Sequence, residues 1–502
     1  MASPGRLVAL TGAAILTLAA CEQPSGPETG GDSGPVPEKV WLGATDRLIP
    51  VGSQESMGLA IRLNDDGVTR NYLASNWPDD AEVLWAVSDE DIIEVDALGR
   101  IEAIGAGKAM VFVSVGGVID SAMVHTVPPT ARLDGPTQVD IGLGLACALD
   151  QSGAAYCWGS DLGGAMGRGK ARAWTDAMMA APVVGGHRFR EIRVGRQHAC
   201  AIGAADHRAY CWGHGNNGQI GNGRDGSEFP YGLEYGDPLL MGIAEPLPVL
   251  GNLTFRALAT GGEHTCGLTE AGEAFCWGSH QLGQLGTGDF VQGKAGATGS
   301  ASPVPVAGGH RFESIVSGPH HVCGLDEKGR AFCWGWNQAG QLGAVSSSSC
   351  IGGACSKVPI RAADGLRFDL LAAAITRTCG STVDGTLYCW GEGRSLPVEV
   401  PDAPPASKIV AGQMFTCILD FEGQVRCNNG GFDSGSGFQV RWPDSAHRFL
   451  SVSALSQAVC GITLDATVRC WHEGYYHGPA GVFGIGGGIP SNQPEEVIVG
   501  GG

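Results

Sequence analysis

The sequence has few basic residues and no cluster of them. Lysine and arginine together number 32, against 51 aspartates and glutamates, so the formal net charge is −19. No run of Lys and Arg interrupts this acidic excess. A face that binds nucleic acid must neutralise phosphates with clustered basic side chains. The composition therefore argues against a nucleic-acid partner.

Sequence signatures of catalysis are also missing. There is no HExxH motif and no nucleophile elbow, and the glycine-rich segments follow predicted strands without opening a helix, which a phosphate-binding loop requires. Five acidic residues recur near predicted turns: Asp150, Glu270, Asp326, Asp384 and Asp420. Asp and Glu favour turns, so a structural role is the simpler interpretation and a calcium or catalytic ring the alternative. We expect no enzymatic activity, no catalytic residue, no metal and no cofactor.

Apolar runs long enough to span a membrane are missing as well. The stretch from Leu7 to Ala20 follows Arg6 and is shorter than the ~20 residues of a typical spanning helix. It ends on Leu-Ala-Ala-Cys, which resembles a bacterial lipobox and implies lipidation of Cys21. We expect residues 1–21 to be a lipoprotein signal peptide, with an ordinary cleavable signal as the alternative, and residues 22–39 to be a flexible linker. This predicts export and lipid anchoring at the bacterial cell envelope.

Cysteine, by contrast, is abundant, and its spacing is regular. In "HTCGLTEAGEAFCWG", Cys266 and Cys276 lie at equal distances from a three-residue turn that ends on Gly272, so a hairpin would place them opposite each other. At about 4.5 Å between Cα atoms, such a pair is within disulfide reach. The recurrence of this unit, with a loop one residue longer in the second copy, predicts seven hairpin pairs: Cys147 with Cys157, Cys200 with Cys211, Cys266 with Cys276, Cys323 with Cys333, Cys379 with Cys389, Cys417 with Cys427, and Cys460 with Cys470.

Cys350 and Cys355 make one further predicted pair, which leaves only Cys21 of the seventeen cysteines. Zinc would prefer four ligands with a C-x2-4-C spacing, so the local pairs favour disulfides. Persistent disulfides require an oxidising compartment, which agrees with export.

The first folded segment, residues 40–129, contains no cysteine and has alternating runs such as "AMVFVSV" that predict a small β-sandwich. Val83 to Gly117 resembles the bacterial immunoglobulin-like domain of group 2. The matching residues are Trp85, Ser88, Asp89, Val95, Gly99 and Gly105-Ala106-Gly107. The resemblance implies a stalk or spacer module.

Residues 131–502 consist of repeats with four strand-like pieces each, for example "FRALATG", "HTCGL", "AFCWG" and "PVPVAG". Four short strands per repeat predict a β-propeller blade, and seven copies can close a ring that is stable as a monomer. The predicted fold is therefore all-β, a seven-bladed propeller preceded by an Ig-like sandwich.

The repeat pattern G-x-x-H-x-C-x-L, Y/F-C-W-G and G-Q-L-G is similar to the regulator of chromosome condensation repeat, over roughly residues 137 to 502. "GQIG" begins at Gly218 and "GQLG" at Gly283 and Gly340, whereas the last three blades lack this motif and the sixth has Asn428 in place of Trp. The family implies guanine-nucleotide exchange and chromatin binding. Export and acidity both disfavour those activities here.

Histidines recur two residues before a cysteine, at His198, His264 and His321. They could converge on a metal. Other copies have Leu145, Arg377, Phe415 and Ala458 at this position, so we interpret it as a packing position.

Within each repeat, the turn between the first and second strands and the long loop after the third strand leave from the same rim of the predicted propeller. We expect the binding site on this rim, because variable loops on a rigid scaffold usually contain the residues that bind a partner. The turn candidates are Arg196, Gln197, Glu263, His320, Ile375 and Met414, and the candidates after the third strands are His214, His280, Trp336, Tyr475 and Tyr476. Aromatic residues are typical anchors, although some could instead pack beneath loops. The predicted partner is an extracellular or envelope protein, and the alternative is a polysaccharide binder or carbohydrate-active enzyme.

Overall fold

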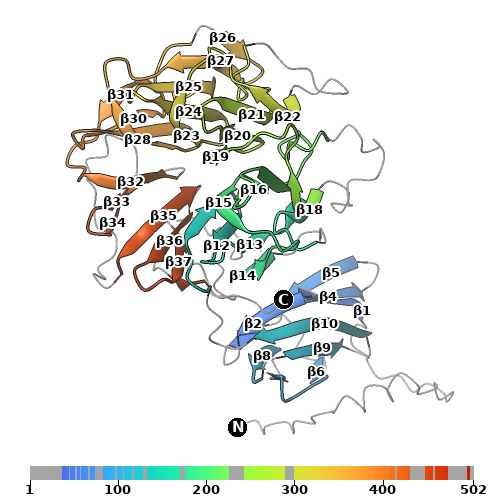
Figure 1. Ribbon diagram of the computed structural model, residues 1–502. Coiled ribbons are helices and arrows are strands. Elements are labelled where there is room, and N and C mark those ends of the chain that lie inside the picture. Colours follow the sequence, from blue (N-terminus) through green and yellow to red (C-terminus); the bar gives the residue numbers. More distant parts are fainter. Residues whose placement is uncertain are drawn as a thin grey trace, which may run out of the picture. The chain divides into compact units, whose positions relative to one another are not determined.

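The structure is a computed structural model, and it is all-β (Figure 1). It describes residues 37–43, 46–50, 54–56, 58–65, 68–73, 83–96, 99–105, 107–115, 118–127, 133–169, 176–224, 242–288, 299–346, 348–412, 415–429, 447–455, 458–472 and 495–497. No helix within these ranges has the length and hydropathy needed to cross a bilayer. The predicted signal peptide, Cys21 and residues 22–36 of the predicted linker lie outside the described residues, whereas residues 37–39 of that linker belong to strand β1. The chain divides into two compact units, one up to Ala131 and one from Arg132 to Gly500.

The described part of the first unit contains three sheets. Their strand orders are β1 (Pro37–Gly43), β4 (Gly58–Asp65), β5 (Val68–Leu73); β2 (Asp46–Pro50), β10 (Val118–Val127), β9 (Gly107–Val115), β6 (Val83–Val87); and β3 (Gln54–Ser56), β8 (Arg100–Ala103), β7 (Ile93–Val95). Along β9 every second residue is buried, from Ala109 to Val115, so one face of the strand makes the core. Trp85 lies directly against Gly99, where an added Cβ would come within 2.3 Å of the indole.

The second unit contains seven sheets within its described residues. The first three are β11 (Gln138–Ile141), β12 (Leu145–Leu149), β13 (Ala155–Ser160), β14 (Asp176–Pro182); β15 (Phe189–Val194), β16 (His198–Gly203), β17 (Ala209–His214), β18 (Gly242–Pro248); and β19 (Ala257–Thr260), β20 (His264–Leu268), β21 (Ala274–Ser279), β22 (Gly299–Pro305). The short 3-10 helix η1 (Leu162–Gly164) follows β13.

The fourth sheet has an additional strand, with the order β23 (Phe312–Ser317), β24 (His321–Asp326), β25 (Ala331–Trp336), β27 (Gly353–Arg361), β26 (Ser348–Cys350). The last three are β28 (Phe368–Ala373), β29 (Arg377–Thr382), β30 (Leu387–Gly391), β31 (Arg394–Glu399); β32 (Ala406–Ala411), β33 (Phe415–Asp420), β34 (Val425–Asn429); and β35 (Phe449–Leu455), β36 (Ala458–Thr463), β37 (Val468–His472), β38 (Glu495–Glu496). Each sheet is an antiparallel meander, because its strands pair in chain order apart from the added hairpin β26–β27.

The cores of this unit lie between successive sheets. One apolar cluster joins the first sheet to the second, another joins the second to the third, and so on along the chain. A further cluster joins the seventh sheet to the first, with Val468 and Val497 packed among Leu133 and Val139. Ser453 Oγ also donates a hydrogen bond to Asp140 Oδ1 at 2.6 Å. The two ends of the repeat array therefore meet, as the sequence predicts.

All eight predicted disulfides are present. The Cys350 to Cys355 bond closes β26 onto β27. In the seven repeat hairpins the paired cysteines are direct cross-strand partners with Cα atoms 4.0–4.1 Å apart, the close approach expected of a non-hydrogen-bonded pair. These seven bonds join Cys147 to Cys157, Cys200 to Cys211, Cys266 to Cys276, Cys323 to Cys333, Cys379 to Cys389, Cys417 to Cys427, and Cys460 to Cys470.

The turns of these hairpins have the backbone conformation that the spacing predicts. Gly272 has a φ of +77°, as a three-residue loop requires at its last position. In the seventh hairpin Ala466 accepts the left-handed conformation with a φ of +58°. The cysteine pairing is therefore strictly local, each bond flanking its own turn.

The repeated Trp and the G-Q-L-G motif form one contact between neighbouring sheets. The indole of Trp334 is fully buried and donates from Nε1 to Gln284 O of the preceding sheet at 2.9 Å. The last glycine of that motif, Gly286, lies over the same indole, and a Cβ there would come within 2.9 Å of Nε1. Trp212, Trp277 and Trp390 repeat the hydrogen bond with Ala165, Gln219 and Gln341. The motif therefore joins the first five sheets in series.

The recurring histidines also connect neighbouring sheets. His198 Nε2 lies 3.0 Å from Thr265 Oγ1, and His321 Nε2 lies 2.8 Å from Thr378 Oγ1. His264 Nε2 is 2.9 Å from Ser317 Oγ, which lies on the first strand of the next sheet, whereas Thr265 and Thr378 lie on the second strand of theirs. All three rings are fully buried, and burial lowers the pKa of His198 and His321 to about 3. They are neutral packing residues, and no group of three or more His, Cys, Asp or Glu within the described ranges has metal-site geometry.

Candidate functional site

The two ends of the second unit differ in construction. One end carries the turns between first and second strands and the loops after third strands, and we call it the loop rim. In the fourth sheet its described residues are 318–320, 337–346 and 348–352. The opposite end, with the hairpins between second and third strands, is the hairpin rim; in the fourth sheet it comprises 327–330. On the hairpin rim Asp150, Asp326 and Asp420 each accept hydrogen bonds from backbone N–H groups two and four residues ahead. Those three carboxylates therefore stabilise turns.

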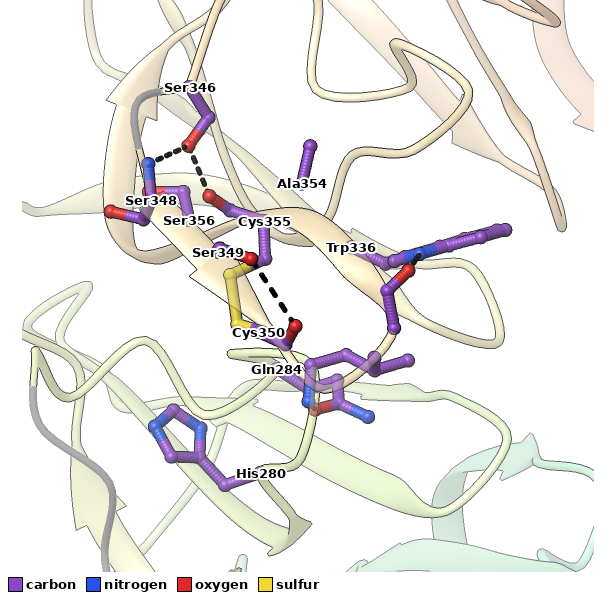
Figure 2. Close-up of a disulfide and its surroundings, with 12 residues drawn as sticks. His280, Gln284, Trp336, Ser346, Ser348, Ser349, Cys350, Ala354, Cys355 and Ser356 are labelled. Atoms are coloured by element: carbon purple, nitrogen blue, oxygen red, sulfur yellow. Dashed lines mark hydrogen bonds between the residues drawn. A yellow bond between two sulfur atoms is a disulfide. The ribbon is translucent and has the colours of Figure 1, made fainter.

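The most distinctive feature of the loop rim is the hairpin β26–β27 of the fourth sheet (Figure 2). Cys350 pairs with Gly353 at its tip, and the disulfide to Cys355 closes it. Ser346 Oγ donates to Cys355 O, which fixes the entering chain to β27. The turn between the strands consists of Ile351 and Gly352. A tip of this kind is held by covalent and hydrogen bonds before any partner arrives.

Trp336 supports this tip through a hydrogen bond from its indole. Its backbone N–H donates to His320 O at 2.9 Å, and its indole Nε1 donates to Gly352 O at 3.1 Å (Figure 2). The His320 ring meets the indole edge to face, with 5.7 Å between centroids. The indole is half-buried, so one part braces the hairpin and the rest faces outward.

The tip presents apolar side chains to solvent. Ile351 is 76% exposed and Val345, which precedes the hairpin, is 86% exposed. Leu282 of the third sheet lies beside the turn, because a Cβ at Gly352 would come within 2.7 Å of its side chain. Exposed apolar groups with a polar surround are typical of protein contact sites, and here Ser348 and Ser349 provide that surround. We call Ile351, Trp336, Val345 and Leu282 the apolar tip.

His280 is a predicted contact residue, with packing beneath a loop as the alternative, and the structure shows that alternative. The side chain is fully buried. Its Nδ1 accepts a hydrogen bond from Leu285 N at 3.0 Å, and its Nε2 lies 3.3 Å from Thr287 Oγ1. Asp161 and Asn337 accept the equivalent backbone hydrogen bond in the first and fourth sheets, so this position stabilises the loop. Sequence alignment of the repeats contained the signal, because His280 corresponds to Asn337 and not to Trp336.

The turn residues Arg196 and Glu263 come from neighbouring sheets, and their charges shift the pKa of the same two histidines. Burial lowers the pKa of both His214 and His320, while the Glu263 carboxylate opposes that shift and the Arg196 guanidinium adds to it. Arg196 is exposed, and its backbone N–H donates to Gly261 O of the third sheet. The structure therefore brings these four predicted residues into one polar group beside the apolar tip.

The remaining predicted residues are less informative. Gln197 and Ile375 are half-buried in their turns. Met414, Tyr475 and Tyr476 lie outside the described residues. The sequence reasoning missed Ile351 and Val345, although an apolar residue between the two cysteines of "CIGGAC" could have indicated an exposed tip.

The series of antiparallel sheets indicates a β-propeller-like fold built from repeats, and the comparisons with known proteins agree with it. The regulator of chromosome condensation (RCC1) repeat matches residues 255–284 and 312–341, and a second model of the same repeat matches 271–325. The chain is 26% identical to the ultraviolet-B receptor UVR8 of Arabidopsis thaliana over 397 residues, which is 74% of this chain and 82% of that protein.

Two solved structures show the same fold. Prp20p of Saccharomyces cerevisiae superposes with a TM-score of 0.52 at 21% identity, over 66% of this chain and 83% of that one; its structure was described together with its binding to Gsp1p and histones. Human WBSCR16 superposes with a TM-score of 0.56 at 16% identity, over 68% and 93%. The chain thus contains RCC1 repeats in a β-propeller-like fold.

Proposed function

We propose that this protein is a non-enzymatic scaffold whose loop rim binds a protein partner, centred on the apolar tip. The observation that carries the proposal is an exposed Ile351 on a disulfide-closed turn that the Trp336 indole supports through Gly352 O. A preorganised tip loses little entropy on binding, which favours affinity. Aromatic and aliphatic anchors of this kind often contribute most of the binding energy.

The scaffold in this proposal is a seven-bladed propeller. Packing of Val497 and Val468 against Val139 supports closure between the last blade and the first. The binding of Gsp1p and histones by Prp20p supports a protein-binding role for the fold. The acidity of this chain does not suit histone-associated DNA, and the proposed export separates it from nuclear GTPases.

The proposal includes export and anchoring. Cys21 would carry the lipid, and residues 40–129 would be an Ig-like spacer between the membrane and the propeller. Cys21→Ser is expected to move the protein from the membrane fraction to the soluble fraction, because a single cysteine holds the anchor. Fractionation of both forms by immunoblot tests this, and an unchanged membrane fraction would rule out the lipobox.

Binding is tested with Trp336→Ala. Loss of an anchor aromatic typically costs about 2 kcal/mol, or roughly a thirtyfold weaker Kd. The full chain and the variant are used to capture envelope proteins, and the retained proteins are quantified by mass spectrometry. We expect one protein to be retained by the wild type and depleted with Trp336→Ala.

The matched control is Lys328→Ala, on the hairpin rim of the same sheet, which should retain that protein fully. Melting temperatures of both variants should stay close to the wild type, because Trp336 is not a core residue. Depletion by the Lys328 variant alone, or retention of polysaccharide in place of protein, would overturn the proposal.

A further inference from the structure

We infer a second docking surface, independent of the loop rim, on the hairpin rim of the fifth, sixth and seventh sheets. The geometry points to a cationic polypeptide segment with apolar side chains as its occupant. The proposed function assigns nothing to this rim.

The surface consists of large apolar residues at one position of three consecutive hairpins. Val383 is 78% exposed, Phe421 is 76% exposed and Leu464 is 63% exposed. Each directly follows the residue that stabilises its turn. The first, third and fourth sheets have Gln151, Glu270 and Glu327 at this position. The turn therefore does not require an apolar side chain, and the exposed carbon surface needs another explanation.

The three hairpins follow one another along the rim, and the fifth and sixth hairpins each contact the start of the next sheet. Phe449 N donates to Gly423 O of the sixth hairpin, and Leu464 N of the seventh hairpin donates to Arg448 O, both at 2.8 Å. Leu450 follows directly and is 60% exposed, so it adds to the apolar area between these hairpins.

The fifth hairpin adjoins the sixth sheet through Pro405. A Cβ at Gly385 would lie 3.5 Å from the Pro405 ring, and the next residue, Ala406, pairs with Asp420 at the base of the sixth hairpin. The apolar positions thus follow one another along the rim.

A carboxylate follows each apolar residue: Asp384, Glu422 and Asp465, all exposed. Hydrogen bonds from the Thr382 and Thr463 hydroxyls hold the pKa of Asp384 and Asp465 below the usual range, so these groups stay charged. The corresponding residues of the first, third and fourth sheets are Ser152, Ala271 and Lys328. Three arginines lie near these acids. Arg426 of the sixth sheet is engaged by Asp420 at 3.0 Å. Arg469 of the seventh sheet acts on Asp465 and helps to keep its pKa low, and Arg448 adjoins Gly423 of the sixth hairpin. Unlike the first, third and fourth sheets, the fifth, sixth and seventh sheets therefore each carry a large exposed apolar residue followed by an acid.

Charge complementarity selects the occupant. Anionic lipid headgroups and nucleic acid would be repelled by the row of carboxylates. A polypeptide with Lys or Arg beside Leu or Phe would match both features, because its apolar groups would cover Phe421 and its neighbours while its cations meet the acids.

The test uses synthetic peptides with the full chain. Three peptides of equal length are titrated by fluorescence anisotropy at low and high salt. The first is an amphipathic Leu/Lys peptide, the second has Glu in place of each Lys, and the third is all Lys. We expect the Leu/Lys peptide alone to bind at both salt concentrations. Phe421→Ser and Val383→Ser should each weaken it about tenfold or more. Leu396→Ser, a change of the same kind at a residue of β31 that is 67% exposed and belongs to neither surface, should leave it unchanged.

Three results would overturn this inference. If the all-Lys peptide bound as tightly as the Leu/Lys peptide at low salt and neither bound at high salt, the attraction would be to net charge only. An unchanged Kd in both hairpin variants, with unchanged melting temperatures, would place the binding elsewhere. Binding of the Leu/Glu peptide, or of phosphatidylglycerol vesicles in preference to the Leu/Lys peptide, would contradict the assigned occupant. None of these results depends on the loop rim.

Discussion

Acidification from pH 7 to pH 5 is expected to lower the free energy of unfolding by about 4 kcal/mol. His198 and His321 are neutral in the fold, where burial lowers the pKa of each to about 3, whereas an unfolded histidine titrates near pH 6.5. Below pH 6.5 the unfolded chain therefore binds protons that the folded chain does not. Stability is complete above that pH and is lost as the pH falls toward 3, by about 2 kcal/mol per histidine at pH 5. His264, whose pKa burial also lowers, adds in the same direction.

Denaturant midpoints at pH 7, 6 and 5 measure this effect. The carboxylates with lowered pKa, such as Asp326 and Asp384, lose their contribution only at pH values nearer 4, so the window from 6.5 to 5 reports mainly on the histidines. The double variant His198→Gln with His321→Gln retains a polar partner for Thr265 and Thr378 and should flatten the profile. An equally steep profile in the double variant would show that these rings are not its source.

Trp334→Ala is expected to cost about 3–5 kcal/mol of stability, the usual range for a buried Trp. The side chain is fully buried, donates to Gln284 O and packs against Phe312 at 5.8 Å between centroids. Its removal opens a cavity between two sheets and leaves that carbonyl without its indole donor.

Trp336→Ala is the matched control, two residues further along the same strand. The indole there is half-buried and contacts a surface turn, so its loss should shift the denaturant midpoint little. Similar costs for the two variants would contradict the assignment of Trp334 to the core and Trp336 to the surface.

The hairpins could be predicted in detail because their determinants are local. The spacing of Cys266, Gly272 and Cys276 specifies a turn, a register and a disulfide without reference to the rest of the chain. The recurrence of that unit, with the G-Q-L-G motif, was enough to predict the propeller-like repeats. The structural role of the motif could not be predicted from the sequence. Gly286 packs against Trp334 of the next sheet, and a contact between residues so far apart in the chain leaves no local signal.

The candidate site was only partly predictable. Trp336 and His320 could be proposed from their position on the loop rim. The exposure of a side chain on that rim depends on how the loops fold back, which the sequence does not specify. His280 is buried by the loop that it stabilises, and Ile351 is exposed by a hairpin that the spacing of Cys350 and Cys355 only suggests. Val383, Phe421 and Leu464 lie on short turns of uniform length. Because binding sites are expected on long, variable loops, the sequence gave no reason to expect partner binding at these turns.

Site-specific photo-crosslinking tests the loop-rim account most directly. A photoreactive amino acid at position 351 in the full chain, irradiated with an envelope extract, is expected to yield one discrete crosslinked protein, and Trp336→Ala in the same chain should reduce its yield by releasing the tip. The same group at position 328, on the opposite end of the sheet, should not yield that product. A crosslinked protein from position 328 and none from position 351 would contradict the central claim that the loop rim is the partner-binding face.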